Sequence, residues 1–140
     1  MTEAGPTSEE PLFWEGAGPG GYAAFFEDDG KVAYAYLLYE DQIVADVWLY
    51  NRAVTAEEPE WHDRALAPFL NPQGFASDEA FEPLAEENEV DFEWTGAPDN
   101  PTLYVLIRGE RHARLVHGSK PGWCRLAAKD GPLAKVLPAG

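Results

Sequence analysis

Residues 22–51 hold three strand-like runs separated by turns of only two or three residues, and this pattern restricts the fold more than any other part of the chain. All three runs are rich in aromatic and aliphatic residues: Tyr22–Glu27, Lys31–Tyr39 and Gln42–Asn51. Asp28-Asp29-Gly30 favours a tight reversal because glycine adopts a positive φ easily, and Glu40-Asp41 can form the second turn. Turns this short join antiparallel strands, so the segment predicts an antiparallel meander.

The third run has two faces that are both mostly apolar. Its alternate residues form two sets, Ile43, Ala45, Val47 and Leu49 on one side and Val44, Asp46, Trp48 and Tyr50 on the other. Two apolar faces predict a central strand that is covered on both sides. An ionised carboxylate on such a face needs a partner. We expect Asp46 to pair with an arginine of the later basic hairpin or to lie at an edge, unless it lines a pocket with Trp48 and Tyr50.

A second antiparallel set is predicted after residue 89. Residues 90–94 alternate apolar and acidic side chains, which is the pattern of a half-exposed strand. Thr102–Arg108 and Arg111–His117 flank a turn at Gly109-Glu110 and predict a hairpin. Trp123–Ala128 is a candidate for one more strand.

Residues 52–87 separate the two sets and predict helical and irregular structure. Thr55 and Glu58 match a capping box and indicate a short helix near 56–66. Ser77-Asp78-Glu79 can begin a second helix. The predicted fold class is therefore α+β, an antiparallel sheet of about six strands in two meanders with one or two short helices. An all-β barrel or roll is the alternative.

The length and composition favour a single domain, 1–140, because 140 residues with 45% hydrophobic content can bury a core without disulfides. Glycine and proline are frequent in the first 21 residues, and we expect 1–11 to be a flexible leader. Leu12, Phe13 and Trp14 interrupt this stretch, so we expect them to dock onto the body of the protein or onto a partner.

The terminus and the single cysteine predict a cytoplasmic location. Met1–Pro11 lacks the basic and apolar regions of a secretory signal, and no apolar run is long enough to span a membrane. Cys124 has no second cysteine in the chain to pair with, which suits a reducing compartment.

The charge is strongly negative and unevenly distributed. The formal net charge is −15, yet 108–140 holds seven of the ten basic residues and only two acidic ones. The simplest reading places the basic segment among acidic strands of the same fold. A surface of this sign repels phosphate backbones and anionic lipids, so nucleic acid and membranes are excluded as partners. A basic protein is the partner that the charge favours.

The reactive side chains form no catalytic or metal-binding signature. His62 lacks the second histidine four residues later that a zinc-binding helix needs, because residue 66 is Leu. His112 and His117 are an odd number of residues apart, so a regular strand would point them to opposite faces. No Cys–His signature surrounds Cys124. We therefore predict no cofactor and no metal, and we favour a binding protein over an enzyme.

The leading hypothesis is a non-enzymatic acidic protein that neutralises or tethers a basic protein partner. An immunity-type toxin inhibitor is the concrete form of this hypothesis. Its predicted contact surface combines acidic residues with one aromatic anchor: Glu57, Glu58, Glu60, Trp61, Asp63, Glu82, Glu86 and Glu87. The alternative is a small-molecule-binding module or an unrecognised enzyme with an aromatic-lined pocket. The residues predicted for that pocket are Asp46, Trp48, Tyr50, His112 and His117. The oligomeric state is left open.

Overall fold

Two sheets make up the part of the chain that the computed structural model describes, which is residues 12–51, 71, 76 and 87–137. The first sheet has the order β1-β2-β3-β4, with all neighbours antiparallel: β1 (Leu12–Ala17), β2 (Tyr22–Asp28), β3 (Val32–Tyr39) and β4 (Gln42–Asn51). A 3-10 helix, η3 (Glu87–Glu89), leads into the second sheet. That sheet runs β5 (Val90–Ala97), β6 (Asn100–Ile107), β7 (Glu110–Leu115), β8 (Trp123–Cys124) and β9 (Lys135–Val136), and only β8 and β9 pair in parallel.

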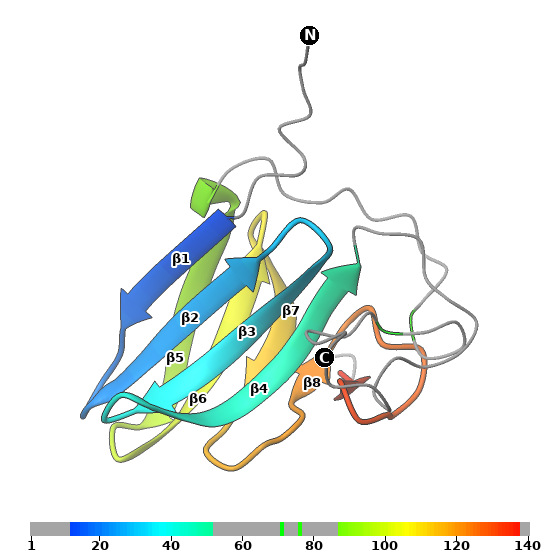
Figure 1. Ribbon diagram of the computed structural model, residues 1–140. Helices are drawn as coiled ribbons and strands as arrows, with labels where there is room; N and C mark the ends of the chain where they lie inside the picture. Colours follow the sequence, from blue (N-terminus) through cyan, green and yellow to red (C-terminus); the bar gives the residue numbers. More distant parts are fainter. Residues whose placement is uncertain (1–11, 52–70, 72–75, 77–86, 138–140) are drawn as a thin grey trace, which may run out of the picture.

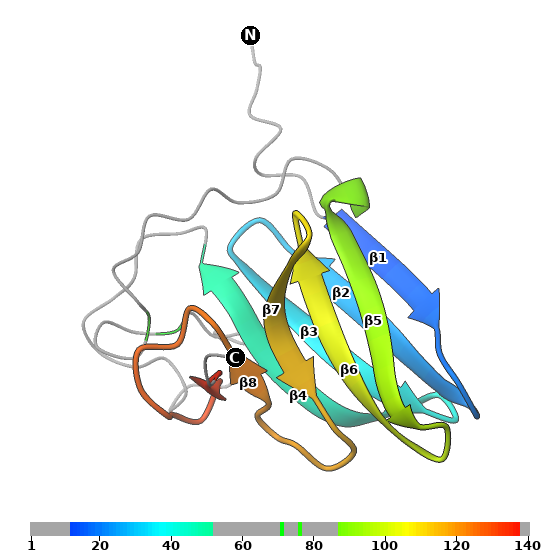
Figure 2. The same ribbon diagram turned by 180° about the vertical axis from the view of Figure 1, so that it is seen from behind.

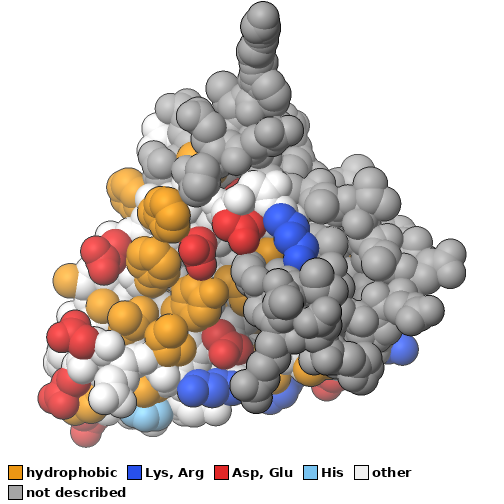
Figure 3. Space-filling model, viewed as in Figure 1, with side chains coloured by type: hydrophobic (Ala, Val, Ile, Leu, Met, Phe, Trp, Pro, Cys, Tyr) orange, Lys and Arg blue, Asp and Glu red, His pale blue; other side chains and the backbone are white. Residues whose placement is uncertain are grey.

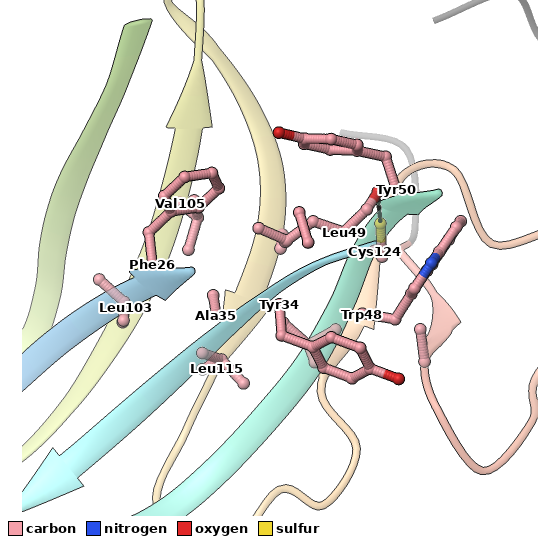
Figure 4. Packing of buried hydrophobic residues seen from close by; sticks show 14 of the residues in the cluster. Phe26, Tyr34, Ala35, Trp48, Leu49, Tyr50, Leu103, Val105, Leu115 and Cys124 are labelled. Atoms are coloured by element: carbon pink, nitrogen blue, oxygen red, sulfur yellow. Dashed lines mark hydrogen bonds between the residues drawn. The ribbon is translucent and has the colours of Figure 1, made fainter. Parts of the chain in front are cut away.

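The two sheets face each other and bury one face each, as Figures 1 and 2 show from opposite sides. In β2 and β6 every second side chain is buried, which is the alternation expected when only one face of a strand meets the core. Figure 4 shows Phe26 and Ala35 of the first sheet beside Leu103, Val105 and Leu115 of the second. Removing these apolar side chains from water is the main stabilising contribution of the sandwich.

The α+β prediction is wrong. The described residues contain no α-helix, and their strands form two sheets rather than one. The physical reason is that the two meanders cover each other, so neither sheet needs a helical layer to bury its apolar face. The all-β class, which was the alternative, is the one observed. The predicted helix near 56–66 lies outside the described residues, as does most of the second predicted helix. No helix in the described ranges has the length and apolar character needed to cross a membrane.

The segment expected to follow a flexible leader contains a strand. β1 pairs with β2 along its whole length, for example Phe13 opposite Glu27 and Gly16 opposite Ala24. The glycines near this strand create space for the second sheet. A Cβ on Gly16 would lie 2.7 Å from Phe92 Cδ2, and a Cβ on Gly18 would lie 2.5 Å from the Trp94 ring. The prediction for 1–11 falls outside the described residues.

β4 was predicted to be central, but it is the last strand of its sheet. Its free edge is covered by the chain that follows β7. The Gly118 amide donates to the Val44 carbonyl at 2.8 Å, and the Gly122 amide donates to the Asp46 carbonyl at 2.7 Å. Further along, the Trp48 amide donates to the carbonyl of Leu133 at 2.9 Å. These bonds tie the two sheets together on this side and satisfy backbone groups at the edge of β4.

The basic segment is partly neutralised by acidic residues at and near β5, as the simplest reading of the charge pattern expects. Arg108 Nε lies 2.8 Å from Glu89 Oε1, and Arg111 Nε lies 2.9 Å from Glu93 Oε1. Both ion pairs are solvent-exposed, so each adds little to stability. They pair two of the seven basic residues of 108–140 with carboxylates of neighbouring segments.

Candidate binding surface on the first sheet

The residues predicted to share a pocket do not lie together. Asp46 and Trp48 point to the outer face of the first sheet, whereas Tyr50 points inward. The cause is a β-bulge: Trp48 lies opposite Tyr34, but Tyr50 lies opposite Ala33, so Leu49 is an extra residue. The Tyr50 hydroxyl donates a hydrogen bond of 2.5 Å to Asp28 Oδ2, inside the sandwich.

The two histidines of that predicted pocket are also separated. His112 is buried, with Nε2 2.8 Å from the Leu49 carbonyl oxygen. His117 follows β7 and is exposed, with Nδ1 2.8 Å from the Tyr22 hydroxyl. Cys124 is buried near the same Leu49 carbonyl, and burial raises the pKa of its thiol to about 12. Among the described residues, no group of three or more potential ligands could hold a metal ion.

The predicted acidic contact surface falls almost entirely outside the described residues. Seven of its members belong there: Glu57, Glu58, Glu60, Trp61, Asp63, Glu82 and Glu86. Glu87 is the first residue of η3. This surface therefore stays a prediction.

The outer face of the first sheet carries a stripe of aromatic rings that crosses three strands. We define the aromatic stripe as Phe13, Phe25, Tyr36 and Tyr34. Consecutive ring centroids are 6.0, 6.2 and 6.3 Å apart, and consecutive ring planes differ by only 30°, 33° and 16°. Figure 3 shows hydrophobic side chains gathered over this face, with acidic side chains between them. Near-parallel rings in contact form one continuous apolar surface.

Exposure varies along the aromatic stripe. Phe13 at the β1 end is 50% exposed, Phe25 and Tyr36 are half-buried, and Tyr34 is buried. Ile43 of β4 is also 50% exposed, and it pairs with Leu38 on the same face. Phe13 and Ile43 belong to the two edge strands of this sheet, so apolar side chains are exposed at both of its sides.

Three carboxylates share the outer face with the stripe. Strand pairing places Glu15 beside Phe25, Glu27 beside Phe13, and Asp46 beside Tyr36. Burial raises the pKa of the Tyr36 hydroxyl, and the nearby negative charges of Glu27 and Asp46 raise it further. Burial likewise raises the pKa of Asp46, while the positive charge of Lys120 acts in the opposite direction. The face therefore combines aromatic surface with negative charge that is incompletely solvated.

The sequence of β3 holds a signal for this surface. In β3 the large residues Tyr34 and Tyr36 alternate with the small residues Ala33 and Ala35, which suggests two unequal packing layers. The structure places the small residues inward, where the second sheet packs against them. The large aromatic residues point outward instead of into the core.

Comparison with known proteins adds no relative: the chain matches no family model, and no curated protein or solved structure shows significant similarity to it.

Proposed function

We propose that this protein is a non-enzymatic binding protein that holds a basic protein partner on the outer face of its first sheet. An immunity-type inhibitor of a toxin would be one such protein. The observation that carries the proposal is the partly exposed aromatic stripe, with Phe13 as its exposed end, and the carboxylates on the same face: Glu15, Glu27 and Asp46.

The two components of this face have different physical roles. Exposed aromatic side chains supply large contact area at low conformational cost, and they are frequent among the residues that dominate binding energy. Carboxylates complementary to a basic surface contribute specificity and speed association. The net charge of −15 would steer a basic partner toward the protein at low ionic strength.

Capture of the partner with matched variants tests the proposal. Tagged protein is incubated with lysate of the cells that produce it and washed across a salt series, and the bound proteins are identified. Phe13→Ser should lower retention of a basic partner roughly thirtyfold, because truncating an aromatic anchor costs about 2 kcal/mol. Val136→Ser changes an exposed apolar residue of β9, 39% exposed, and serves as the control that should retain the partner.

Two outcomes would contradict the proposal. Equal retention by Phe13→Ser and the control would remove the aromatic stripe as the contact surface. Loss of binding only when charges are reversed at Glu57, Glu60 and Glu86 would instead favour the acidic surface predicted from the sequence.

A further inference from the structure

The second sheet shows how this protein holds an arginine of its own on an aromatic ring. The guanidinium carbon of Arg111 lies 3.9 Å from the centroid of the Tyr104 ring. Its Nε is 2.9 Å from Glu93 Oε1, and Glu93 lies directly opposite Tyr104 in the β5–β6 pairing. The three groups form a unit in which one cation contacts a tyrosine ring and the carboxylate beside it.

Two of these three kinds of group, a tyrosine ring and a carboxylate beside it, also occur on the outer face of the first sheet. Asp46 lies directly opposite Tyr36 in the β3–β4 pairing, and the Glu27 carboxylate on β2 is close enough to the Tyr36 hydroxyl to raise its pKa. Among described residues, no cation lies over the Tyr36 ring, and none forms an ion pair or hydrogen bond with the Asp46 carboxylate. Lys120 acts on Asp46 only through its charge. Within the described residues, the first sheet thus combines the tyrosine and its carboxylates without a cation stacked on the ring.

We infer that Tyr36, Glu27 and Asp46 form a seat for the guanidinium group of an arginine side chain carried by the partner. This inference rests on the proposed function and names the chemistry that the surface selects. A guanidinium suits the seat because its plane stacks on an aromatic ring while its N–H groups bond to carboxylates. A lysine ammonium is a more strongly hydrated point charge without the planar fork, so it should bind more weakly.

Short synthetic peptides test the seat without the whole partner. The probe is a capped pentapeptide with arginine at its centre, and two matched peptides carry citrulline or lysine there. Binding is followed by the shifts of backbone amide signals in two-dimensional NMR. The arginine peptide should shift the signals of Tyr36 and Asp46. Citrulline keeps the shape but removes the charge, so it should weaken binding about tenfold or more, and lysine should weaken it severalfold.

Variants connect the peptide to the named residues. Asp46→Asn and Tyr36→Leu should each reduce affinity for the arginine peptide roughly fivefold to tenfold, since each removes one of the charged or aromatic contacts. Asp91→Asn removes an exposed carboxylate of β5 and should leave affinity unchanged. The amide spectrum of each variant shows whether it is folded, and either variant suffices for the test.

Two results would overturn the inference: an arginine peptide that shifts none of these signals at millimolar concentration, or arginine and citrulline peptides that bind equally well. If that happens while Phe13→Ser still abolishes capture of a basic partner, the arginine seat is wrong and the proposed function stands. Failure of both experiments would remove both.

Discussion

Asp46 is a partly buried carboxylate on the outer face of β4, and its burial lowers the stability of the fold when the carboxylate is ionised. Because burial disfavours the charged form, its pKa in the folded protein is higher than in the unfolded chain, where the group is hydrated. The folded state therefore takes up a proton at a pH at which the unfolded chain is still ionised. Stability rises as the pH falls through the raised pKa, and the ionised group costs stability at neutral pH.

Asp46→Asn should therefore raise the Tm at neutral pH by roughly 1–3 °C, once solvent screening of this half-exposed group is allowed for. The gain should shrink as the pH falls through the raised pKa of Asp46, because the wild-type carboxyl then becomes protonated. Thermal unfolding followed by circular dichroism measures both, with Asp91→Asn as a control expected to change little. A lower Tm for Asp46→Asn at neutral pH would mean that attraction to Lys120 outweighs desolvation.

The turns show how short sequence signals specify whole elements. Glu40 and Asp41 have φ values of 49° and 70°, so the predicted two-residue turn between β3 and β4 forms with both residues in the left-handed region. Two-residue turns of this kind match the twist of the paired strands. In the second hairpin the left-handed pair is Arg108 and Gly109, with φ values of 51° and 83°. That is one residue earlier than the predicted Gly109-Glu110.

The β1–β5 side of the sandwich depends on the absence of side chains at two positions. Gly16 and Gly18 let the rings of Phe92 and Trp94 approach the backbone of the first sheet. A glycine is needed here for space, since a Cβ at either position would lie closer than 3.0 Å to a ring atom. The glycine-rich character of the early chain, which predicted flexibility, thus serves packing in this region.

Gly18→Ala should destabilise the protein by about 1–3 kcal/mol, because the indole of Trp94 or the strand must shift to admit the methyl group. Gly16→Ala should cost less, since one atom of the Phe92 ring lies closer than 3.0 Å, compared with three of the Trp94 ring at Gly18. Urea unfolding gives the free energy of unfolding for each variant. Ala17→Ser, at an exposed position of β1, is the matched control. No loss of stability in Gly18→Ala would show that this side of the sandwich is loosely packed.

The molecule as a whole presents two different outer faces. On the second sheet, Arg111 covers Tyr104, and Arg114 and Lys135 lie 4.4 and 4.8 Å from the centroid of the Trp123 ring. On the first sheet, Phe13, Phe25 and Tyr36 have no such cation from the described residues. Three basic residues of 108–140 thus lie over aromatic rings of their own sheet, whereas none of the described cations lies over Phe13, Phe25 or Tyr36.

A net charge of −15 also predicts a response of the whole molecule to salt. Like charges repel one another in the compact state more than in the expanded chain, so screening should stabilise the fold. We expect the Tm to rise as sodium chloride is added from low to physiological ionic strength. A falling Tm over this range would show that attractive ion pairs, such as Arg108 with Glu89, outweigh the general repulsion.

Much of the strand content was determined by sequence alone. Gln42–Asn51 was predicted with the bounds that the structure shows, and Tyr22–Glu27 and Lys31–Tyr39 each differ from the observed strand by one residue. These predictions depend on alternation and turn residues, which act between neighbours along the chain. The same alternation groups Tyr34 with Tyr36 on one face of β3 and Asp46 with Trp48 on one face of β4.

What only the tertiary structure decided depends on contacts between distant segments. β1 was missed because its pairing with β2 and its packing on Phe92 stabilise a segment whose own composition favours a loop. Tyr50 was assigned to the wrong face because a bulge at Leu49 shifts the alternation. The Leu49 carbonyl oxygen lies 2.8 Å from Nε2 of His112 in the second sheet, which is a contact between distant segments. Which face of each strand turns inward is a choice that alternation leaves open. It is settled only when the two sheets bury their faces against each other.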